Sequence, residues 1–125
     1  MTNQKSKIKN QKTVVARASF VRNAPRKLRL VADAVRGLSP LSAIEALKHL
    51  PQRGARPVRL VLEQAMGNAK NNAGFSPDRL LIDTIQVMGG PRVAKKSDVH
   101  ARGARFGRGT RVKRLSHVLV RLKEV

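Results

Sequence analysis

The sequence contains no cysteine. It therefore offers no disulfide, no thiolate ligand for zinc and no thiol nucleophile, and this absence fits a reducing compartment. It also lacks any run of about 18 apolar residues, so we expect no helix that crosses a membrane. These two absences argue against a disulfide-stabilised scaffold and against a helical membrane protein.

Aromatic residues are scarce: the chain has no tryptophan or tyrosine, and its 3 phenylalanines are Phe20, Phe75 and Phe106. Proteins that read single strands by stacking present two or three aromatics on an exposed sheet face, so this mode of recognition is not expected. We interpret Phe20 and Phe75 as core or rim residues. Phe106 lies between Arg105 and Arg108 with nothing of this chain to bury it, and it fits equally well a base-stacking residue and an apolar contact to another protein.

Acidic residues number only 7 and are scattered singly. Acid–base catalysis needs two carboxylates, or a carboxylate and a histidine, together in one pocket. The 3 histidines, His49, His100 and His117, show no metal-ligand spacing. The glycines between 103 and 109 lack the Gly-Lys-Ser/Thr of a phosphate-binding loop. We therefore predict no enzymatic activity, no metal and no cofactor.

Positive charge is in excess, since 27 lysines and arginines against 7 acids give a formal net charge of +20. Such a charge opposes compactness unless a polyanion neutralises it, and the usual polyanion is nucleic acid. Residues 1–12 are rich in Lys, Asn and Gln and lack an apolar segment, so we interpret them as a disordered basic tail and not a secretory signal. The 125 residues suit one domain, which we expect at 13–125.

The charge is densest from Gly89 to His117, which holds nine lysines and arginines and one acid, Asp98. Turn-forming residues at its start and in its middle, such as Pro91 and Gly107, predict two antiparallel limbs. A limb of about 13 residues at about 3.3 Å each projects about 40 Å. Because the segment repels itself and has few large apolar residues, we expect residues 89–117 to form a protruding basic hairpin arm that a polyanion orders.

Alternating apolar residues predict strands at 13–22, 80–87 and 117–122. In the first strand, one side is expected to carry Val14, Ala16, Ala18 and Phe20. In the last strand, the inward side is expected to carry Val118, Val120 and Leu122. The second and third strands flank the arm directly, so its two limbs are expected to continue a pair of strands rooted in the body.

Helical periodicity predicts three helices: from Pro25 to Gly37, from Ser39–Pro40 to near Leu50, and from about 53 to 72. Their apolar faces are expected to be Leu28, Val31, Ala32 and Val35 in the first, Leu41, Ile44 and Leu47 in the second, and Val58, Val61, Leu62, Ala65 and Ala69 in the third. Ser42 with Glu45 also fits a capping box. Together the elements predict an α+β fold, in which three helices pack on a small three-stranded antiparallel sheet with a long extended β-hairpin arm.

The order of these elements from about residue 15 to 125 resembles the universal large-ribosomal-subunit protein family numbered twenty-two. The resemblance rests on Ala16-Arg17-Ala18, Val21-Arg22, Pro25-Arg26-Lys27, Arg29-Leu30-Val31, Arg36-Gly37, Ala65, Asn68-Ala69, Asn72, Gly74, Pro77-Asp78, Gly90-Pro91, the Arg-rich arm and Ser116-His117-Val118.

The resemblance implies a structural and assembly role on the ribosome, cytoplasmic or organellar, without catalysis. The body would bind large-subunit rRNA, and the hairpin would line the nascent-peptide exit tunnel beside neighbouring ribosomal proteins and the passing nascent peptide. The implied RNA-binding residues of the body are Arg17, Arg22, Arg26, Lys27 and Arg29. Those implied in the arm are Arg92, Lys95, Lys96, Arg102, Arg105, Arg108, Arg111, Lys113 and Arg114. Phe106 and His117 complete the set of residues that we predict to bind RNA.

The chain departs from the family pattern in three places. Ala24 stands before Pro25 where a capping serine is usual, Pro57 lies at the entry of the third helix, and the arm tip from about 98 to 109 matches the pattern only with a shift in register. An alternative function is an architectural DNA-binding protein with a basic β-arm. A cationic membrane-surface peptide is a third possibility, disfavoured because the basic stretches lack an apolar helical face.

Overall fold

The computed structural model describes residues 12–94 and 112–125, so the expected tail and the outer part of the arm lie outside it. The described elements are, in chain order, β1 (Thr13–Val21), α1 (Pro25–Val35), α2 (Pro40–His49), α3 (Ala55–Asn71), the short 3₁₀ helix η1 (Pro77–Arg79), β2 (Leu80–Ala94) and β3 (Val112–Glu124). The predicted α+β class, with three helices and a three-stranded antiparallel sheet, is confirmed within these residues.

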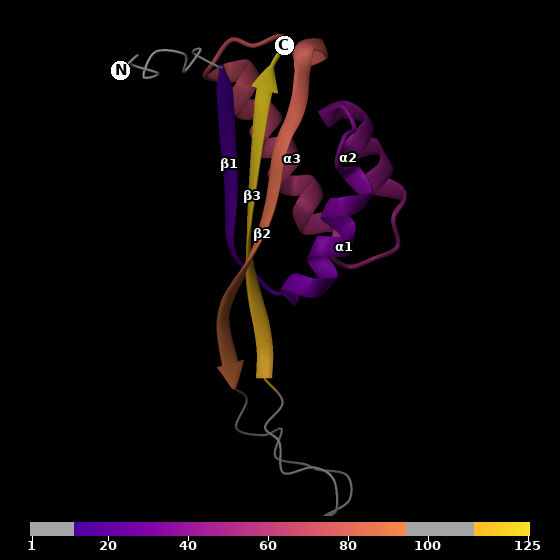
Figure 1. Cartoon of the computed structure of the whole chain (residues 1–125), viewed down its shortest axis with the longest axis vertical. Helices are drawn as coiled ribbons and strands as arrows, with labels where there is room; N and C mark the ends of the chain where they lie inside the picture. Colours follow the sequence, from indigo (N-terminus) through magenta and orange to yellow (C-terminus); the bar gives the residue numbers. More distant parts are fainter. Residues whose placement is uncertain (1–11, 95–111) are drawn as a thin grey trace, which may run out of the picture.

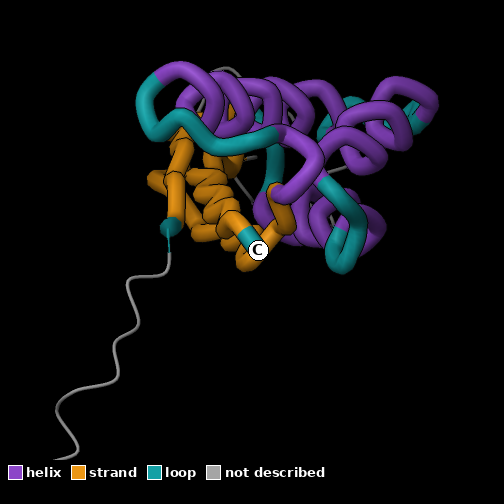
Figure 2. The backbone as a smooth tube through the Cα atoms, turned by 90° about the horizontal axis from the view of Figure 1, so that it is seen from above, coloured by secondary structure: helices purple, strands orange, loops and turns teal. Residues whose placement is uncertain are grey.

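The sheet has the order β1-β3-β2, so β3 is the central strand and pairs antiparallel with both neighbours. The three strands run side by side along the long axis of the molecule (Figure 1). All three helices lie on one side of the sheet (Figure 2), so the opposite face is open. None of the helices in the described ranges is long and apolar enough to span a membrane.

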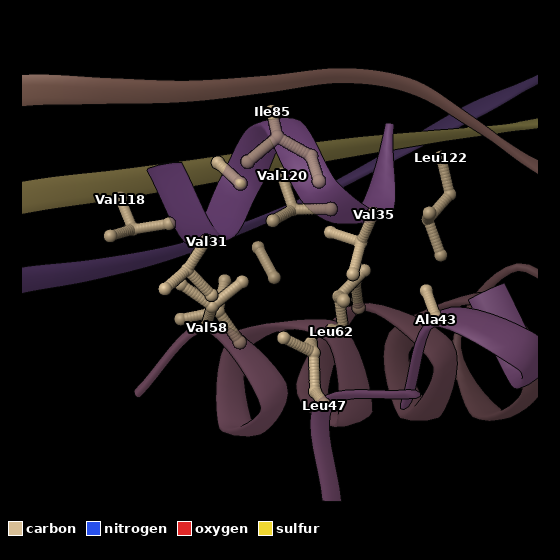
Figure 3. Close-up of a cluster of buried hydrophobic side chains, with 14 of the residues drawn as sticks. Val31, Val35, Ala43, Leu47, Val58, Leu62, Ile85, Val118, Val120 and Leu122 are labelled. Carbon is tan, nitrogen blue, oxygen red and sulfur yellow. The ribbon is translucent and has the colours of Figure 1, made fainter. Parts of the chain in front are cut away.

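The hydrophobic core fills the space between the sheet and the helices (Figure 3). On β3, Val118, Val120 and Leu122 are 0% exposed, which confirms the predicted inward side of this strand. The predicted apolar faces of α1 and α3 are likewise buried. Each of these residues follows the period of its element, two in a strand and 3.6 in a helix, so the pattern alone located the core.

Helix α1 begins with Pro25 in its first turn, and its N-cap residue, Ala24, makes no side-chain hydrogen bond to the helix. The chain leaves this helix through Gly37 at φ +80°, a left-handed conformation that glycine adopts without strain. Both predicted ends of the helix are therefore confirmed, and so is the missing cap at its start.

The predicted apolar face of α2 was partly wrong. Leu47 is buried and Ile44 half-buried, but Leu41 is 49% exposed and the buried first-turn residue is Pro40. The buried stripe of α2 consists of Pro40, Ala43 and Leu47, which are three and four residues apart, and Leu41 lies about 100° around the helix axis from Pro40. The N-cap is Ser39, whose hydroxyl accepts a hydrogen bond from the Ser42 backbone N–H at 3.3 Å.

Helix α3 starts at Ala55, which places Pro57 in its first turn, where no intrahelical hydrogen bond is lost. Its N-cap, Gly54, lies against α1: a Cβ added there would stand 3.1 Å from the Leu28 side chain. Glycine at this position therefore permits the close approach of the two helices.

The two strands that flank the arm continue into it, as predicted. Figure 1 shows β2 and β3 continuing beyond the helices, and their pairing extends to Arg92 opposite Arg114, Val93 opposite Lys113 and Ala94 opposite Val112. These pairs lie outside the stretches of apolar alternation, 80–87 and 117–122, and belong to the limbs of the expected hairpin. Within the described residues, the limbs are rooted in paired strands as expected; the predicted tip lies outside them.

Candidate nucleic-acid interface

Two arginines fasten α1 to the edge strand β2. The Arg36 guanidinium donates to the Ile85 carbonyl at 3.0 Å, and that of Arg29 donates to the Val87 carbonyl at 3.4 Å. Arg36 also forms an ion pair with Asp33, with 3.2 Å between Nε and Oδ1. Arg29, predicted to bind RNA, thus also has a structural contact that fixes where its side chain lies.

A buried hydroxyl fastens the turn between β1 and α1 to the central strand. The Ser116 side chain is 0% exposed and donates a hydrogen bond of 2.5 Å to the Asn23 carbonyl. This turn carries Arg22 on one side and Arg26 on the other, both exposed. We call the part of β2 and β3 where Gly89 to Arg92 pairs with Arg114 to Ser116 the foot of the hairpin. The bond therefore positions two of the predicted basic residues beside this foot.

A first hollow lies between α1 and the foot of the hairpin and encloses about 460 Å³. We call it the α1 hollow; its lining is Pro25, Arg26, Arg29, Gly89, Gly90, Arg92, Arg114 and Leu115. Its lining includes four arginines from α1, β2 and β3, and its other lining residues are uncharged.

A second hollow, of about 750 Å³, lies where the β1–α1 turn and the α2–α3 loop face the hairpin. We call it the loop hollow; its lining is Arg22, Ala24, Arg53, Val93, Lys113, Arg114 and Leu115. Arg114 and Leu115 line both hollows, so the two sites share one strand of the hairpin.

The foot of the hairpin carries no compensating acid among the residues that line either hollow. Arg92 and Arg114 stand directly opposite each other across the two strands, an arrangement in which like charges repel. Four carboxylates of the described residues pair with cations instead: Lys12–Glu124, Arg36–Asp33, Arg59–Glu63 and Lys123–Asp83. The charge of Arg92 and Arg114 is therefore available to an external anion.

Guanidinium groups bind phosphate in a planar fork and remain charged at any physiological pH, whereas they make poor acids and bases. Among residues 12–94 and 112–125, no group of three or more His, Cys, Asp or Glu side chains is placed to hold a metal ion. The chemistry that this arrangement supports is the binding of phosphate groups.

The structure brings together five of the predicted RNA-binding residues at the two hollows: Arg22, Arg26, Arg92, Lys113 and Arg114. Arg29 joins them while bonded to β2. Arg17 is exposed on β1 opposite Leu119, and Lys27 is exposed on α1. The predicted residues outside the described ranges are Lys95, Lys96, Arg102, Arg105, Phe106, Arg108 and Arg111.

Sequence reasoning missed Arg53, which lines the loop hollow from the α2–α3 loop. Its surroundings, Pro51 to Gly54, carry no periodic pattern, and only the packing of α3 on α1 brings this loop to the hairpin. The single hint in the sequence was a cation in a turn between two helices.

A comparison with protein-family models gives one match across this architecture. Residues 16–123 match the model of the family described as Ribosomal protein L22p/L17e. The matched range runs from β1 through all three helices to the end of β3 and includes both hollows.

Proposed function

The chain belongs to the Ribosomal protein L22p/L17e family, and on this premise we propose that it anchors to large-subunit rRNA through the two hollows at the foot of its hairpin. As a member of this family it is a non-enzymatic structural component of the large ribosomal subunit. Its place is on ribosomes, and rRNA is among its partners.

One observation carries the proposal: together with Arg29, six cations line two adjoining hollows, and no acidic residue of the described ranges lines either one. These cations come from the β1–α1 turn, α1, the α2–α3 loop and both hairpin strands. The six are Arg22, Arg26, Arg53, Arg92, Lys113 and Arg114. Because the two hollows share Arg114, one RNA strand that crosses the hairpin could place a phosphate group of its backbone in each hollow. Phosphate neutralisation releases counterions, which makes such binding steeply dependent on salt.

We also propose that residues 13–125 form one domain whose arm, 89–117, passes between rRNA segments and lines the nascent-peptide exit tunnel. The support is that β2 and β3 stay paired beyond the core as far as Ala94 opposite Val112, so both described limbs of the hairpin extend away from the body (Figure 1). Neighbouring large-subunit proteins and the nascent peptide would then be partners of this arm, and subunit assembly would depend on its insertion.

The anchoring proposal is tested by measuring the affinity for a large-subunit rRNA transcript over a range of salt concentrations. Because Arg114 lines both hollows, Arg114→Gln should reduce the slope of log K against log salt by about 0.7 to 0.9 for each phosphate that is no longer neutralised. The matched control is Arg79→Gln, an exposed arginine in η1 at the opposite end of β2. Equal slopes for the two variants and the parent would refute the proposal.

The tunnel proposal is tested by site-specific crosslinking. Because the chain has no cysteine, a crosslinker can be attached to a single introduced thiol. A Phe106→Cys variant, carrying a photo-crosslinker and assembled into ribosomes, should crosslink to nascent chains. The same reagent on Leu60→Cys, an exposed position on α3, should not. Labelling of the nascent chain from both positions or from neither contradicts the proposed path of the arm.

A further inference from the structure

The strand pairing near the foot of the hairpin contains one irregularity on β1. Ala18 pairs with Val118 and Val21 with Ser116, so two residues of β1, Ser19 and Phe20, stand opposite a single residue of β3. Such a β-bulge redirects the side chain of the extra residue, and bulges are common next to functional sites.

The extra residue adopts a backbone conformation that disfavours it. Phe20 has φ +56°, and it is the one non-glycine residue with positive φ in the part of the chain that the structure describes. An aromatic residue in this region is strained, and strain of this kind persists where the surrounding structure enforces it. The bulge therefore holds Phe20 in a specific orientation.

His117 supplies the enforcing contacts. The Phe20 backbone N–H donates to His117 Nδ1 at 3.0 Å, and the two rings pack perpendicular to each other, with 5.0 Å between their centroids. His117 lies between Ser116 and Val118, both buried toward the helices, so it belongs to the open face of the sheet. The pair is a rigid aromatic unit on that face.

Apart from its contact with His117, the ring of Phe20 faces solvent, since 62% of the residue is exposed. Its surroundings are basic: β1 and the turn that follows carry the exposed Arg17 and Arg22 and no acid. The cross-strand neighbour of His117 is Met88, 36% exposed, which adds a polarizable side chain on the same face. An exposed aromatic ring beside cations suits a nucleotide, because the base can stack on the ring while its phosphate contacts the cations.

We infer that Phe20 is a stacking platform for an unpaired base of the RNA, with His117 as the residue that positions it. The inference rests on the proposed rRNA binding and adds a base contact to the phosphate contacts of the two hollows. It corrects the interpretation of Phe20 as a core or rim residue, because the bulge turns the ring outward. Base–aromatic stacking tolerates any base, so the platform requires an unpaired nucleotide and no particular sequence.

The chain has no tryptophan, so Phe20→Trp introduces one fluorophore at the platform. The probes are an oligoribonucleotide and an abasic oligonucleotide of the same length, which has phosphates but no bases. Fluorescence should be quenched by the first probe and unchanged by the second. Leu60→Trp, on α3, is the control fluorophore and should respond to neither.

The affinity for a large-subunit rRNA transcript provides the second test. Phe20→Leu keeps the apolar volume without a π face, and Phe20→Asn suits the left-handed backbone without a ring. Each should bind about 5- to 100-fold more weakly than the parent, whereas Leu60→Ala should bind like it. If His117 acts through Phe20, adding His117→Ala to Phe20→Leu should cause no further loss.

The outcomes separate the possibilities. If the Phe20 variants bind RNA like the parent while Arg114→Gln lowers the salt slope, the stacking inference fails and the proposed function stands. If Arg114→Gln leaves the slope unchanged, the proposed function itself fails. If RNA binding is unchanged but Phe20→Asn enters subunits poorly and Phe20→Leu enters normally, the side chain makes an apolar contact with another protein, which also overturns the inference.

Discussion

At the scale of single residues, the foot of the hairpin contains a position, Gly90, where a single added carbon atom would clash with the opposite strand. A Cβ at Gly90 would stand 3.0 Å from both the carbonyl carbon and the oxygen of Leu115, which are backbone atoms that cannot swing aside. The irregular pairing between Gly89 and Arg92 surrounds this contact. Glycine here lets the two strands approach and allows the hairpin to change direction as it leaves the body.

We therefore predict that Gly90→Ala destabilises the body by about 1 to 3 kcal/mol, as overpacking typically does. Denaturant unfolding followed by circular dichroism measures this. Gly67→Ala on α3 is the matched control: its Cβ would meet nothing within 4 Å, so it should stabilise the fold by about 0.5 to 1 kcal/mol. Similar effects of the two substitutions would contradict the steric explanation.

Ser116 supports a second prediction at this scale. Ser116→Ala removes the donor of the part-buried bond to the Asn23 carbonyl and should cost about 1 kcal/mol, because that half-buried acceptor then loses its donor. The rRNA affinity of the folded variant should also fall, since the turn that carries Arg22 and Arg26 is no longer fastened to β3. A stability equal to that of the parent would show that the bond contributes nothing.

Several of these residues were beyond sequence reasoning, and the reasons are physical. The 3.6-residue period located Leu28 and Val31 because burial imposes that period, but the exposure of Leu41 depended on which face of α2 packs against the core. The position of Arg53 follows from packing between distant segments. The outward ring of Phe20 follows from a bulge, and one extra residue in a strand leaves no trace in an alternating pattern.

At the scale of elements, α1 joins the sheet to the interface through both its ends and its side chains. Its arginines bond to β2, its first turn borders the α1 hollow, and its N-cap is unsatisfied. The order, type and approximate bounds of the three helices and three strands were all predictable, because each carries its own period. The continuation of β2 and β3 into the arm was predicted from turn residues and charge and not from apolar alternation, because cross-strand pairing continues after burial ends.

We predict that Ala24→Ser stabilises the protein by about 0.5 to 2 kcal/mol, because Ala24 already has extended N-cap geometry, at φ −67° and ψ 139°. A serine hydroxyl there can accept a hydrogen bond from a backbone N–H of the first turn of α1. Thermal unfolding measures the gain. Ala24→Gly, which changes the same position without an acceptor side chain, is the control, and an equal gain from both would exclude capping as the cause.

The paired arginines Arg92 and Arg114 lead to a prediction in which stability rises while rRNA affinity falls. Arg92→Glu converts the pair with Arg114 from like to unlike charges, so the free protein should become more stable by about 0.2 to 1 kcal/mol. Its rRNA affinity should fall, because a carboxylate then lines the α1 hollow. Unfolding and filter-binding measurements on the same variant check both parts, and a variant that loses both stability and affinity contradicts the electrostatic account.

At the scale of the whole molecule, a compact body holds a strongly charged hairpin clear of its own core. The formal charge of +20 resides on a chain whose described carboxylates are mostly paired away from the hairpin. The two parts are therefore stabilised differently. The apolar core stabilises the body, whereas an external anion neutralises the charge at the foot of the hairpin.

This separation predicts that residues 95–111 can be replaced by an Asn-Gly turn without loss of the body. Ala94 and Val112 are directly paired, and a two-residue turn closes such a pair. The shortened protein should retain a cooperative melt and bind rRNA with a shallower salt dependence, yet enter large subunits poorly. Loss of the cooperative melt would mean that the body is not independently stable.

The position of β3 at the centre of the sheet bears on the timing of biogenesis. β1 and β2 are both edge strands, and each pairs only with β3, which follows them in the chain. During translation neither strand has a partner until β3 has left the synthesising ribosome, so the sheet closes after its other elements are made. A chain interrupted before β3 would therefore have two unpaired strands, β1 and β2, and no second strand for the hairpin.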